Sequence, residues 1–280
     1  MTGNAAVAVL TTLYIKDRLD LFDIAITSIE EQTIDREVRI YLCCDGPLTP
    51  EQNIYVAANA TRFHRIVRSQ KNEGLAKALN HLIEVLEDEA FVFRMDGDDI
   101  SEPERFKSQV ELMTEDPELG LIGCQAWDID EEGSRIGVRN YPIDKTNIAR
   151  SVVGVNPILH PTFCFRREIF RDDRIRYPEA YMSEDLAMVV TLLENGYRIG
   201  NHPDRLFSWR ITPAFFARRQ SWRRGWTEMK WYLRAARSQN EIYSMRIALP
   251  IARLALRAMP AWAVESLYRS GLRDKIVRSK

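Results

Sequence analysis

Cysteine is scarce in this chain of 280 residues, and the few cysteines show no paired spacing. The four cysteines lie at positions 43, 44, 124 and 164, within apolar runs and without a CxxC motif. This pattern favours free, buried thiols in a reducing compartment. The segment Met1–Asn4 leads directly into a strand-like run, so no signal peptide is expected.

Several familiar motifs are missing as well. The chain has no P-loop of the form GxxxxGKS/T, no recognised nucleic-acid-binding motif, no internal repeat and no low-complexity run. P-loop phosphoryl transfer is therefore disfavoured, and nucleic acid is not an expected partner. The fractions of 45% hydrophobic and 28% charged residues are ordinary for a soluble globular protein. The length suits one large α/β domain, with or without an appendage.

Charge is divided unevenly along the chain, although the net charge is only −1. Residues 213–280 contain 15 Lys and Arg against 4 Asp and Glu, a net of +11, which leaves −12 for residues 1–212. Four of the six tryptophans also lie after residue 212. The shift predicts a boundary near residue 213, between a main domain at 1–212 and a basic, Trp-rich helical extension at 213–280.

Strand-like and helix-like patterns alternate in the first half of the chain. Strand-like segments lie at 7–13, 38–44, 65–68 and 90–95, with helical spacing of apolar residues at 19–30 and 75–86 between them. Residues 101–104, Ser-Glu-Pro-Glu, predict a capping box before a further helix. Later strands are expected at 119–126 and 162–165, and a helix at 186–193. Strands separated by helices predict an α/β fold with a doubly wound, mostly parallel sheet.

Carboxylates follow two of these strands. Asp45 comes directly after the second strand, and Asp96, Asp98 and Asp99 follow the fourth within four positions. Ligands of such sheets bind beyond the carboxyl ends of the strands, so these acids should share one rim. Oxygen-rich clusters suit Mg²⁺ or Mn²⁺, with the remaining positions left to water and substrate phosphates. The acids therefore predict a nucleotide-diphosphate site, and a solvated acidic turn is the alternative.

Other polar stretches admit a structural explanation beside a functional one. The segment Asn72–Lys77 opens a helix whose amides can attract an anion, although a capped helix start is the simpler explanation. Glu184 and Asp185 precede another helix and are either capping groups or a general base, since a helix N-terminus favours the ionised carboxylate. The acidic stretch 128–133 is expected to be a hairpin turn, because Arg139 stands where a calcium loop needs Glu.

Six segments in series carry a resemblance to a known family. They are VAVLTTLYIKD (7–17), CCDGP (43–47), NEGLAKALN (72–80), FRMDGDDISEPERFKSQV (93–110), HPTFCFRREIF (160–170) and SEDLAMVVTLLENGYRIGNHPDRLFSWR (183–210). In these segments the chain resembles family 2 glycosyltransferases of the GT-A fold, and the resemblance covers roughly residues 5–225. The similarity is greatest to a bacterial exopolysaccharide and O-antigen subgroup that includes amylovoran-type transferases. Each motif is weak alone, whereas six in the right order are specific.

The resemblance implies a role for each matching residue of the donor site. Asp45 would accept a hydrogen bond from the nucleotide base, commonly uracil. Asp96 would contact the ribose or the metal, and Asp98 would bind a divalent metal, Mn²⁺ or Mg²⁺, that bridges the donor phosphates. Asp99 would assist or only hold the loop. The donor diphosphate or ribose would be flanked by Gly74, Lys77 and Asn80.

The resemblance also implies an inverting reaction. Asp185 would be the catalytic base, with Glu184 beside it as an orienting or acceptor-binding group. Many relatives carry a His shortly after the position of Arg210, and this chain has none there. The metal would then be held mainly by Asp98 and the donor. The arginines expected to share the diphosphate charge are Arg210, Arg218 and Arg219.

The resemblance and the basic extension together predict where the enzyme works. The nucleotide-sugar half is expected at about residues 1–100 and the acceptor half at about 101–212. Residues 247–264 are apolar but carry Arg253 and Arg257, which fits an interfacial amphipathic helix better than a spanning one. We therefore expect a cytoplasmic protein, peripheral on an anionic inner-membrane surface, with a lipid-linked or oligosaccharide acceptor. Packing of the extension on the core, or oligomer contacts, is the alternative.

These patterns predict an inverting, metal-dependent glycosyltransferase that uses a nucleotide sugar, expected to be a UDP-sugar. Surface polysaccharide, O-antigen or capsule biosynthesis is the expected setting. Two other functions stay open from the residues alone. One is a Mg-dependent nucleotidyl or phosphoryl transferase that uses the same acids, and the other is a non-catalytic, sugar-nucleotide-binding scaffold.

Overall fold

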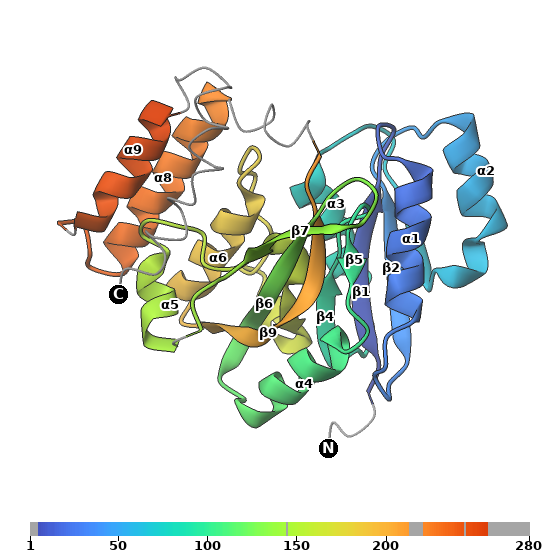
Figure 1. The fold of residues 1–280 in the computed structure, drawn as a ribbon, viewed down its shortest axis with the longest axis horizontal. Coiled ribbons are helices and arrows are strands. Elements are labelled where there is room, and N and C mark those ends of the chain that lie inside the picture. The colour runs from blue at the N-terminus through green and yellow to red at the C-terminus, as the bar shows by residue number, and fades with distance from the viewer. Residues whose placement is uncertain (1–4, 144, 213–220, 244, 257–280) are drawn as a thin grey trace.

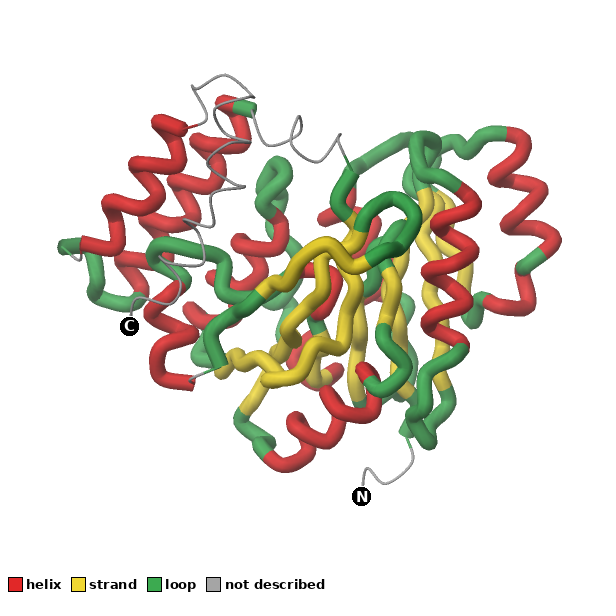
Figure 2. The backbone as a smooth tube through the Cα atoms, viewed as in Figure 1, coloured by secondary structure: helices red, strands yellow, loops and turns green. Residues whose placement is uncertain are grey.

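The computed structural model describes residues 5–143, 145–212, 221–243 and 245–256. Within these residues the chain forms one mixed sheet with helices on both sides (Figure 1, Figure 2). The strand order is β3-β2-β1-β4-β8-β6-β9-β5, and β7 pairs with β6 outside this path. The α/β class expected from the sequence is confirmed.

The first half is a parallel sheet. Its strands are β1 (Val7–Leu13), β2 (Val38–Cys44), β3 (Arg65–Arg68) and β4 (Phe91–Arg94), and all three pairings among them are parallel. The connecting segments contain α1 (Leu19–Glu30), α2 (Pro50–Ala58), the 3₁₀ turn η1 (Ala60–Arg62) and α3 (Leu75–Glu84). Parallel neighbouring strands need such crossover connections, because a tight turn between two adjacent strands makes them antiparallel.

The second half departs from the expected parallel arrangement. Its strands are β5 (Ile100–Ser101), β6 (Leu119–Ile129), β7 (Arg135–Arg139), β8 (Cys164–Arg166) and β9 (Arg198–Arg210). Only β6 and β9 pair in parallel, whereas β8 runs antiparallel to β4 and β6, and β5 runs antiparallel to β9. The expectation was incomplete because alternating patterns do not specify the direction of short strands such as β5 and β8.

The remaining helices lie around the second half. They are α4 (Arg105–Glu115), α5 (Lys145–Ser151), η2 (His160–Thr162), η3 (Arg167–Arg171), α6 (Glu184–Glu194), α8 (Trp222–Ser238), η4 (Met245–Ile247) and α9 (Ala248–Leu256). In Figure 1, α6, α8 and α9 stand on one side of the sheet and α1 and α2 on the other. Among the described residues, no helix is long and apolar enough to cross a membrane. The expectations for Arg218, Arg219 and Arg257 lie outside the described residues.

Two hydrophobic cores fill the space between sheet and helices. Alternate residues of β1 point to opposite faces, so Ala8 and Leu10 belong to one core and Val7 and Val9 to the other. The first core packs against α3, α6 and α8, and the second against α1, α2 and α4. All four cysteines are free and buried in these cores, as their apolar surroundings predicted.

The predicted capping box at residues 101–104 is wrong. Ser101 lies in β5, where it pairs with Phe207 of β9. The Glu102 carboxylate accepts a hydrogen bond from Ser208 Oγ at 2.6 Å instead of capping a helix. Helix α4 begins only at Arg105, with no side-chain hydrogen bond from its N-cap residue. The tertiary pairing of β5 with β9 thus overrides the local pattern.

Candidate active site

The carboxyl ends of β2, β1 and β4 meet at one edge of the sheet. The register aligns Leu13 of β1 with Cys44 of β2, and Leu10 of β1 with Arg94 of β4. Asp45 continues this alignment, since its N–H donates to the carbonyl of Leu13 at 2.9 Å. The segments that follow β2 and β4 therefore share one rim, as the strand order predicted.

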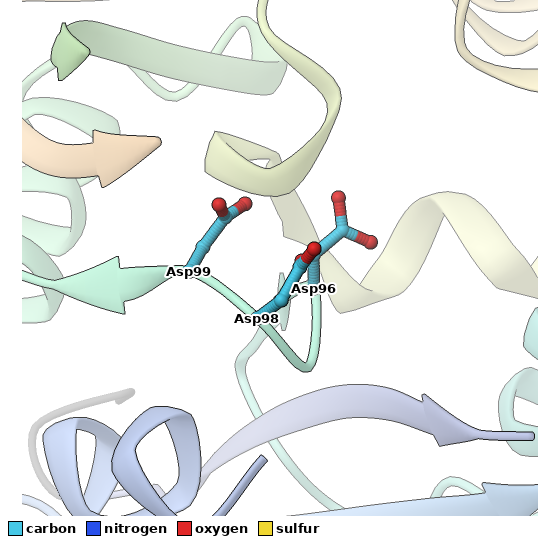
Figure 3. Close-up of side chains that lie close together, drawn as sticks. All are labelled: Asp96, Asp98 and Asp99. Carbon is cyan, nitrogen blue, oxygen red and sulfur yellow. The ribbon is translucent and has the colours of Figure 1, made fainter. Parts of the chain in front are cut away.

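An acidic cluster occupies the loop between β4 and β5. The side chains of Asp96, Asp98 and Asp99 extend from this loop toward one another (Figure 3), and one oxygen from each lies within 4.8 Å of the others. Asp99 is buried, with a side chain that solvent barely reaches. Its burial, followed by the negative charges of Asp98 and Asp96, raises the pKa of the Asp99 carboxyl well above its usual range.

The cluster fits a divalent cation. Oδ1 of Asp99 accepts a hydrogen bond from the Arg210 N–H, whereas Oδ2 is buried and has no hydrogen-bond partner among the described residues. A buried, unpartnered carboxylate oxygen is unfavourable unless a further group satisfies it. Three carboxylates at this spacing offer the hard oxygen ligands that Mg²⁺ and Mn²⁺ prefer.

A buried arginine beneath the cluster was missed by the sequence analysis. Arg94 is the last residue of β4, and its Nη2 forms an ion pair with Asp96. The Arg94 side chain is almost wholly buried, and within the part of the chain that the structure describes its Nε and Nη1 have no hydrogen-bond partner. Residues i and i+2 of an extended strand share a face, so the Arg94–Asp96 spacing was the available signal. The pair lowers the net negative charge of the rim before any ligand binds.

Arg210 holds the acidic loop through the main chain. Its Nε donates to the carbonyl of Asp98 at 2.7 Å, and its Nη1 donates to the carbonyls of Asp130 and Glu131 at 2.8 and 2.7 Å. The guanidinium thus joins the acidic loop to the β6–β7 hairpin. The expected hairpin is confirmed, with a turn in which the N–H of Gly133 donates to the Asp130 carbonyl. These contacts make Arg210 a positioning residue, and a direct contact with the diphosphate stays a prediction.

Asp45 links the rim to the start of α3. Its carboxylate accepts hydrogen bonds from the N–H groups of Glu73 and Gly74 at 2.7 and 3.0 Å. The next residue, Gly46, has a φ of +89°, and a Cβ there would lie 2.5 Å from the main-chain nitrogen of Asn72. Only glycine allows this close approach without displacing the backbone. The turn therefore fixes the Asp45 carboxylate at the edge of the rim.

The other two expected donor-site residues on α3 have structural contacts. Lys77 Nζ lies 3.2 Å from Glu179 Oε1; the Lys77 side chain is partly exposed and that of Glu179 largely exposed. Asn80 forms a reciprocal pair with the main chain of Tyr177, donating to its carbonyl at 2.9 Å and accepting from its N–H at 2.8 Å. Gly97, in the acidic loop, packs closely against the Phe22 ring: a Cβ added at Gly97 would lie 2.7 Å from a carbon of that ring. Contacts of Lys77 and Asn80 with a donor stay predictions.

The second pair of acids begins α6. Asp185 Oδ2 accepts a hydrogen bond from Asn156 Nδ2 at 2.7 Å, a partner that the sequence analysis did not identify. Glu184 accepts a hydrogen bond from the N–H of Met182, whose φ of +52° is rare for a residue with a side chain. Burial is the largest cause that raises the pKa of Glu184. Asp185 is thus oriented by one side chain, while Glu184 is bonded to the main chain.

Tyr177 brings the two sets of acids into one electrostatic environment. Burial raises the pKa of its phenol most, and the charges of Asp185, Asp96 and Glu184 raise it further. Its hydroxyl lies 3.1 Å from Nε2 of the buried His160. Burial, and then the charge of Arg94, lowers the pKa of His160 well below its usual range. The charges of acids after β4 and of those on α6 therefore both act on the same buried phenol, against the opposite effect of Arg94.

The family model for glycosyl transferase family 2 matches residues 13–174. An amylovoran biosynthesis glycosyltransferase, AmsE of Erwinia amylovora, is 29% identical over 277 residues, which cover 93% of this chain and 97% of AmsE. A second relative, of Escherichia coli, is described as UDP-Gal:alpha-D-GlcNAc-diphosphoundecaprenol beta-1,3-galactosyltransferase. It is 25% identical over 276 residues, which cover 97% of this chain and 96% of the relative.

Solved structures share the fold. A mannosyltransferase of Pyrobaculum calidifontis, PcManGT, in complex with GDP-Man and Mn²⁺, superposes with a TM-score of 0.64 at 17% identity. The match covers 97% of this chain and 81% of that one. TarS 1–349 of S. aureus, in complex with UDP, gives a TM-score of 0.61 at 16% identity over 84% of this chain and 69% of that one.

Proposed function

Because the chain belongs to glycosyl transferase family 2 and is therefore a glycosyltransferase, we propose that it is metal-dependent, inverts the anomeric carbon and uses a UDP-sugar. The observation that carries the proposal is the unpartnered Oδ2 of buried Asp99 within the cluster of three acids. A cation there would complete the coordination of this oxygen and reach the donor diphosphate. Complexes of two fold neighbours, one with UDP and one with GDP-Man and Mn²⁺, support a nucleotide and a metal.

The metal would be held by Asp98 and Asp99, with Asp96 nearby and already paired with Arg94. When bound, a divalent cation stabilises the departing diphosphate as a Lewis acid. Asp45 stands on the same rim, at the turn after β2, and its carboxylate bonds the N–H groups just before α3; a base or ribose would lie there. The Arg210 guanidinium, which donates to the main-chain carbonyls of Asp98 and Asp130, would keep the acidic loop in place during turnover.

Asp185 would act as the general base. Its Oδ2 is oriented by Asn156, which leaves Oδ1 to accept the proton of the acceptor hydroxyl. That hydroxyl would attack the anomeric carbon on the face opposite the diphosphate and so invert the configuration. Glu184 has a raised pKa and is suited to hydrogen-bond an acceptor hydroxyl beside the base.

The acceptor would be a lipid-linked saccharide in surface polysaccharide biosynthesis. Support comes from the Escherichia coli relative, whose described acceptor is a diphosphoundecaprenol-linked GlcNAc, and from the amylovoran relative. The basic extension from residue 213 would rest on an anionic membrane surface and bring the acceptor headgroup to the main domain at residues 1–212. Flotation of the full chain with anionic but not neutral vesicles at low salt would support this placement, and equal flotation with both would contradict it.

A donor panel tests the proposed reaction. The full chain is incubated with UDP-, GDP- and dTDP-sugars and Mn²⁺, and release of the nucleoside diphosphate is measured without acceptor. A glycosyltransferase of this kind should slowly hydrolyse its own donor, with faster release after acceptor is added. Turnover of NTPs alone would indicate nucleotidyl transfer, and binding of a sugar nucleotide without any turnover would indicate a scaffold.

A further inference from the structure

Two tryptophans at the start of α8 are unusually exposed. Trp222 and Trp226 have 52% and 48% of their surface exposed, and their rings meet edge to face with centroids 5.9 Å apart. Trp231 of the same helix instead packs against the core. Helix α8 thus packs one tryptophan, partly buried, against the core, yet it leaves this pair largely in solvent. Exposed aromatic clusters of this kind mark interaction sites.

The start of α8, which carries the tryptophan pair, lies beside the loop that leads to the acids of α6. Between the two tryptophans in sequence, Arg223 stacks on the Tyr181 ring, with its Cζ 4.4 Å from the ring centroid. Tyr181 is itself exposed and precedes Glu184 by three residues. The charge of Arg224, the next residue of α8, acts on the Glu184 carboxyl and lowers its pKa against the larger effect of burial. The first turn of α8 therefore borders the loop that leads to Asp185.

Charge and shape at this place favour one kind of ligand. Arg223, between the two tryptophans in sequence, and Lys230, one turn of helix after Trp226, are exposed cations of the same helix. The perpendicular indoles present an electron-rich ring face, which attracts the C–H groups of a sugar ring. A saccharide with an attached diphosphate matches both features, since the sugar packs on the rings and the phosphates meet the cations. A bare bilayer would match the tryptophans but would not need them beside the acids of α6.

We propose that Trp222, Trp226, Arg223 and Tyr181 form the acceptor subsite and bind the sugar and diphosphate of a lipid-linked acceptor beside Asp185. This inference rests on the proposed function and assigns its acceptor side to α8, within the extension. The donor side stays on the rim of the sheet. The extension would therefore contribute directly to acceptor selection.

The test varies the acceptor at saturating donor. The probe is α-D-GlcNAc diphosphate with an octyl chain, and methyl α-D-GlcNAc and inorganic diphosphate separate the sugar and phosphate contributions. We expect the acceptor KM of Trp222→Ala/Trp226→Ala to rise at least tenfold, and the double Phe variant to stay within threefold of wild type. The matched control is Tyr243→Ala, a fully exposed aromatic of the same extension, which should leave the acceptor KM unchanged.

An acceptor KM within twofold of wild type in the double Ala variant would overturn the subsite. Loss of vesicle flotation with an unchanged acceptor KM would also overturn it and would indicate membrane contact. If the wild-type chain consumes no donor, the proposed function fails, and saturation-transfer NMR of the probe then decides the subsite separately. Binding by wild type but not by the double Ala variant supports the subsite, and equal or absent binding rejects it.

Discussion

The main-chain N–H of Arg210 donates to Oδ1 of Asp99 at 2.7 Å, across 111 residues of sequence. The same residue's guanidinium binds the Asp98 carbonyl, so β9 holds the acidic loop from both its main chain and its side chain. One oxygen of Asp99 is thus bonded by protein, and the other has no hydrogen-bond partner in the described residues. The acids are positioned before any cation arrives.

We predict that Arg210→Lys destabilises the protein by about 2–4 kcal/mol, because lysine cannot reach three carbonyls and leaves buried acceptors unsatisfied. The measurement is urea unfolding, with Arg174→Ala as the control. Arg174 is exposed and pairs only with its neighbour Asp172, so its loss should leave the midpoint unchanged. If Arg210 acted only on the diphosphate, Arg210→Lys would weaken UDP binding with no change in the urea midpoint.

Removal of one acid should weaken the metal site selectively. Asp98→Ala is expected to lower Mn²⁺-dependent UDP affinity at least about tenfold, since the cation loses a carboxylate ligand. Titration calorimetry with UDP and Mn²⁺ measures the effect. Glu132→Ala removes an exposed acid from the nearby β6–β7 turn and should change the affinity little. Equal losses in both variants would point to general electrostatics, and unchanged affinity in Asp98→Ala would remove Asp98 from the metal site.

The proposed base can be tested by a change that preserves size. Asp185→Asn should bind UDP and Mn²⁺ like wild type but transfer about 10²–10⁴-fold more slowly, because an amide cannot take the acceptor proton. Asn156→Ala should slow transfer less, since it only releases Asp185 from its 2.7 Å hydrogen bond. Single-turnover assays with saturating donor compare the variants. Near-wild-type transfer by Asp185→Asn would exclude this carboxylate from the mechanism.

His160 predicts a loss of stability in mild acid. Burial keeps its folded-state pKa well below the ordinary value of about 6.5, while the unfolded chain regains that value. Below about pH 6.5 the unfolded state therefore binds a proton that the folded state rejects, and stability falls by up to about 1.4 kcal/mol per pH unit. Above about pH 6.5 this contribution is constant. Urea unfolding between pH 5 and 8 should show a shallower acid slope for His160→Gln, and parallel slopes would contradict the assignment.

Local patterns predicted the parallel half of the sheet well. The bounds of β1, β2 and β3 coincide with the strand-like segments predicted at 7–13, 38–44 and 65–68. The shared rim of Asp45 and the acidic loop followed from strand order alone. The contacts that hold this rim did not, since Asn80 meets Tyr177 across 97 residues and Arg210 meets Asp98 across 112. Such partners depend on tertiary pairing, which no window of sequence contains.

Gly46 offers a test of whether stability and UDP binding depend on the exact position of the Asp45 turn. Gly46 and Gly133 both have φ near +90°, but a Cβ at Gly133 meets nothing within 4 Å, whereas one at Gly46 meets the Asn72 nitrogen at 2.5 Å. Gly133→Ala should therefore lower the free energy of unfolding by about 1–2 kcal/mol, because alanine is strained in the left-handed backbone conformation. Gly46→Ala should lower the free energy of unfolding by about 1–3 kcal/mol more, because its Cβ would overlap the Asn72 nitrogen. It should also weaken UDP binding, because the turn that carries Asp45 would shift. Urea midpoints and UDP titrations measure both, and equal effects of the two substitutions would show that the Asp45 turn tolerates displacement.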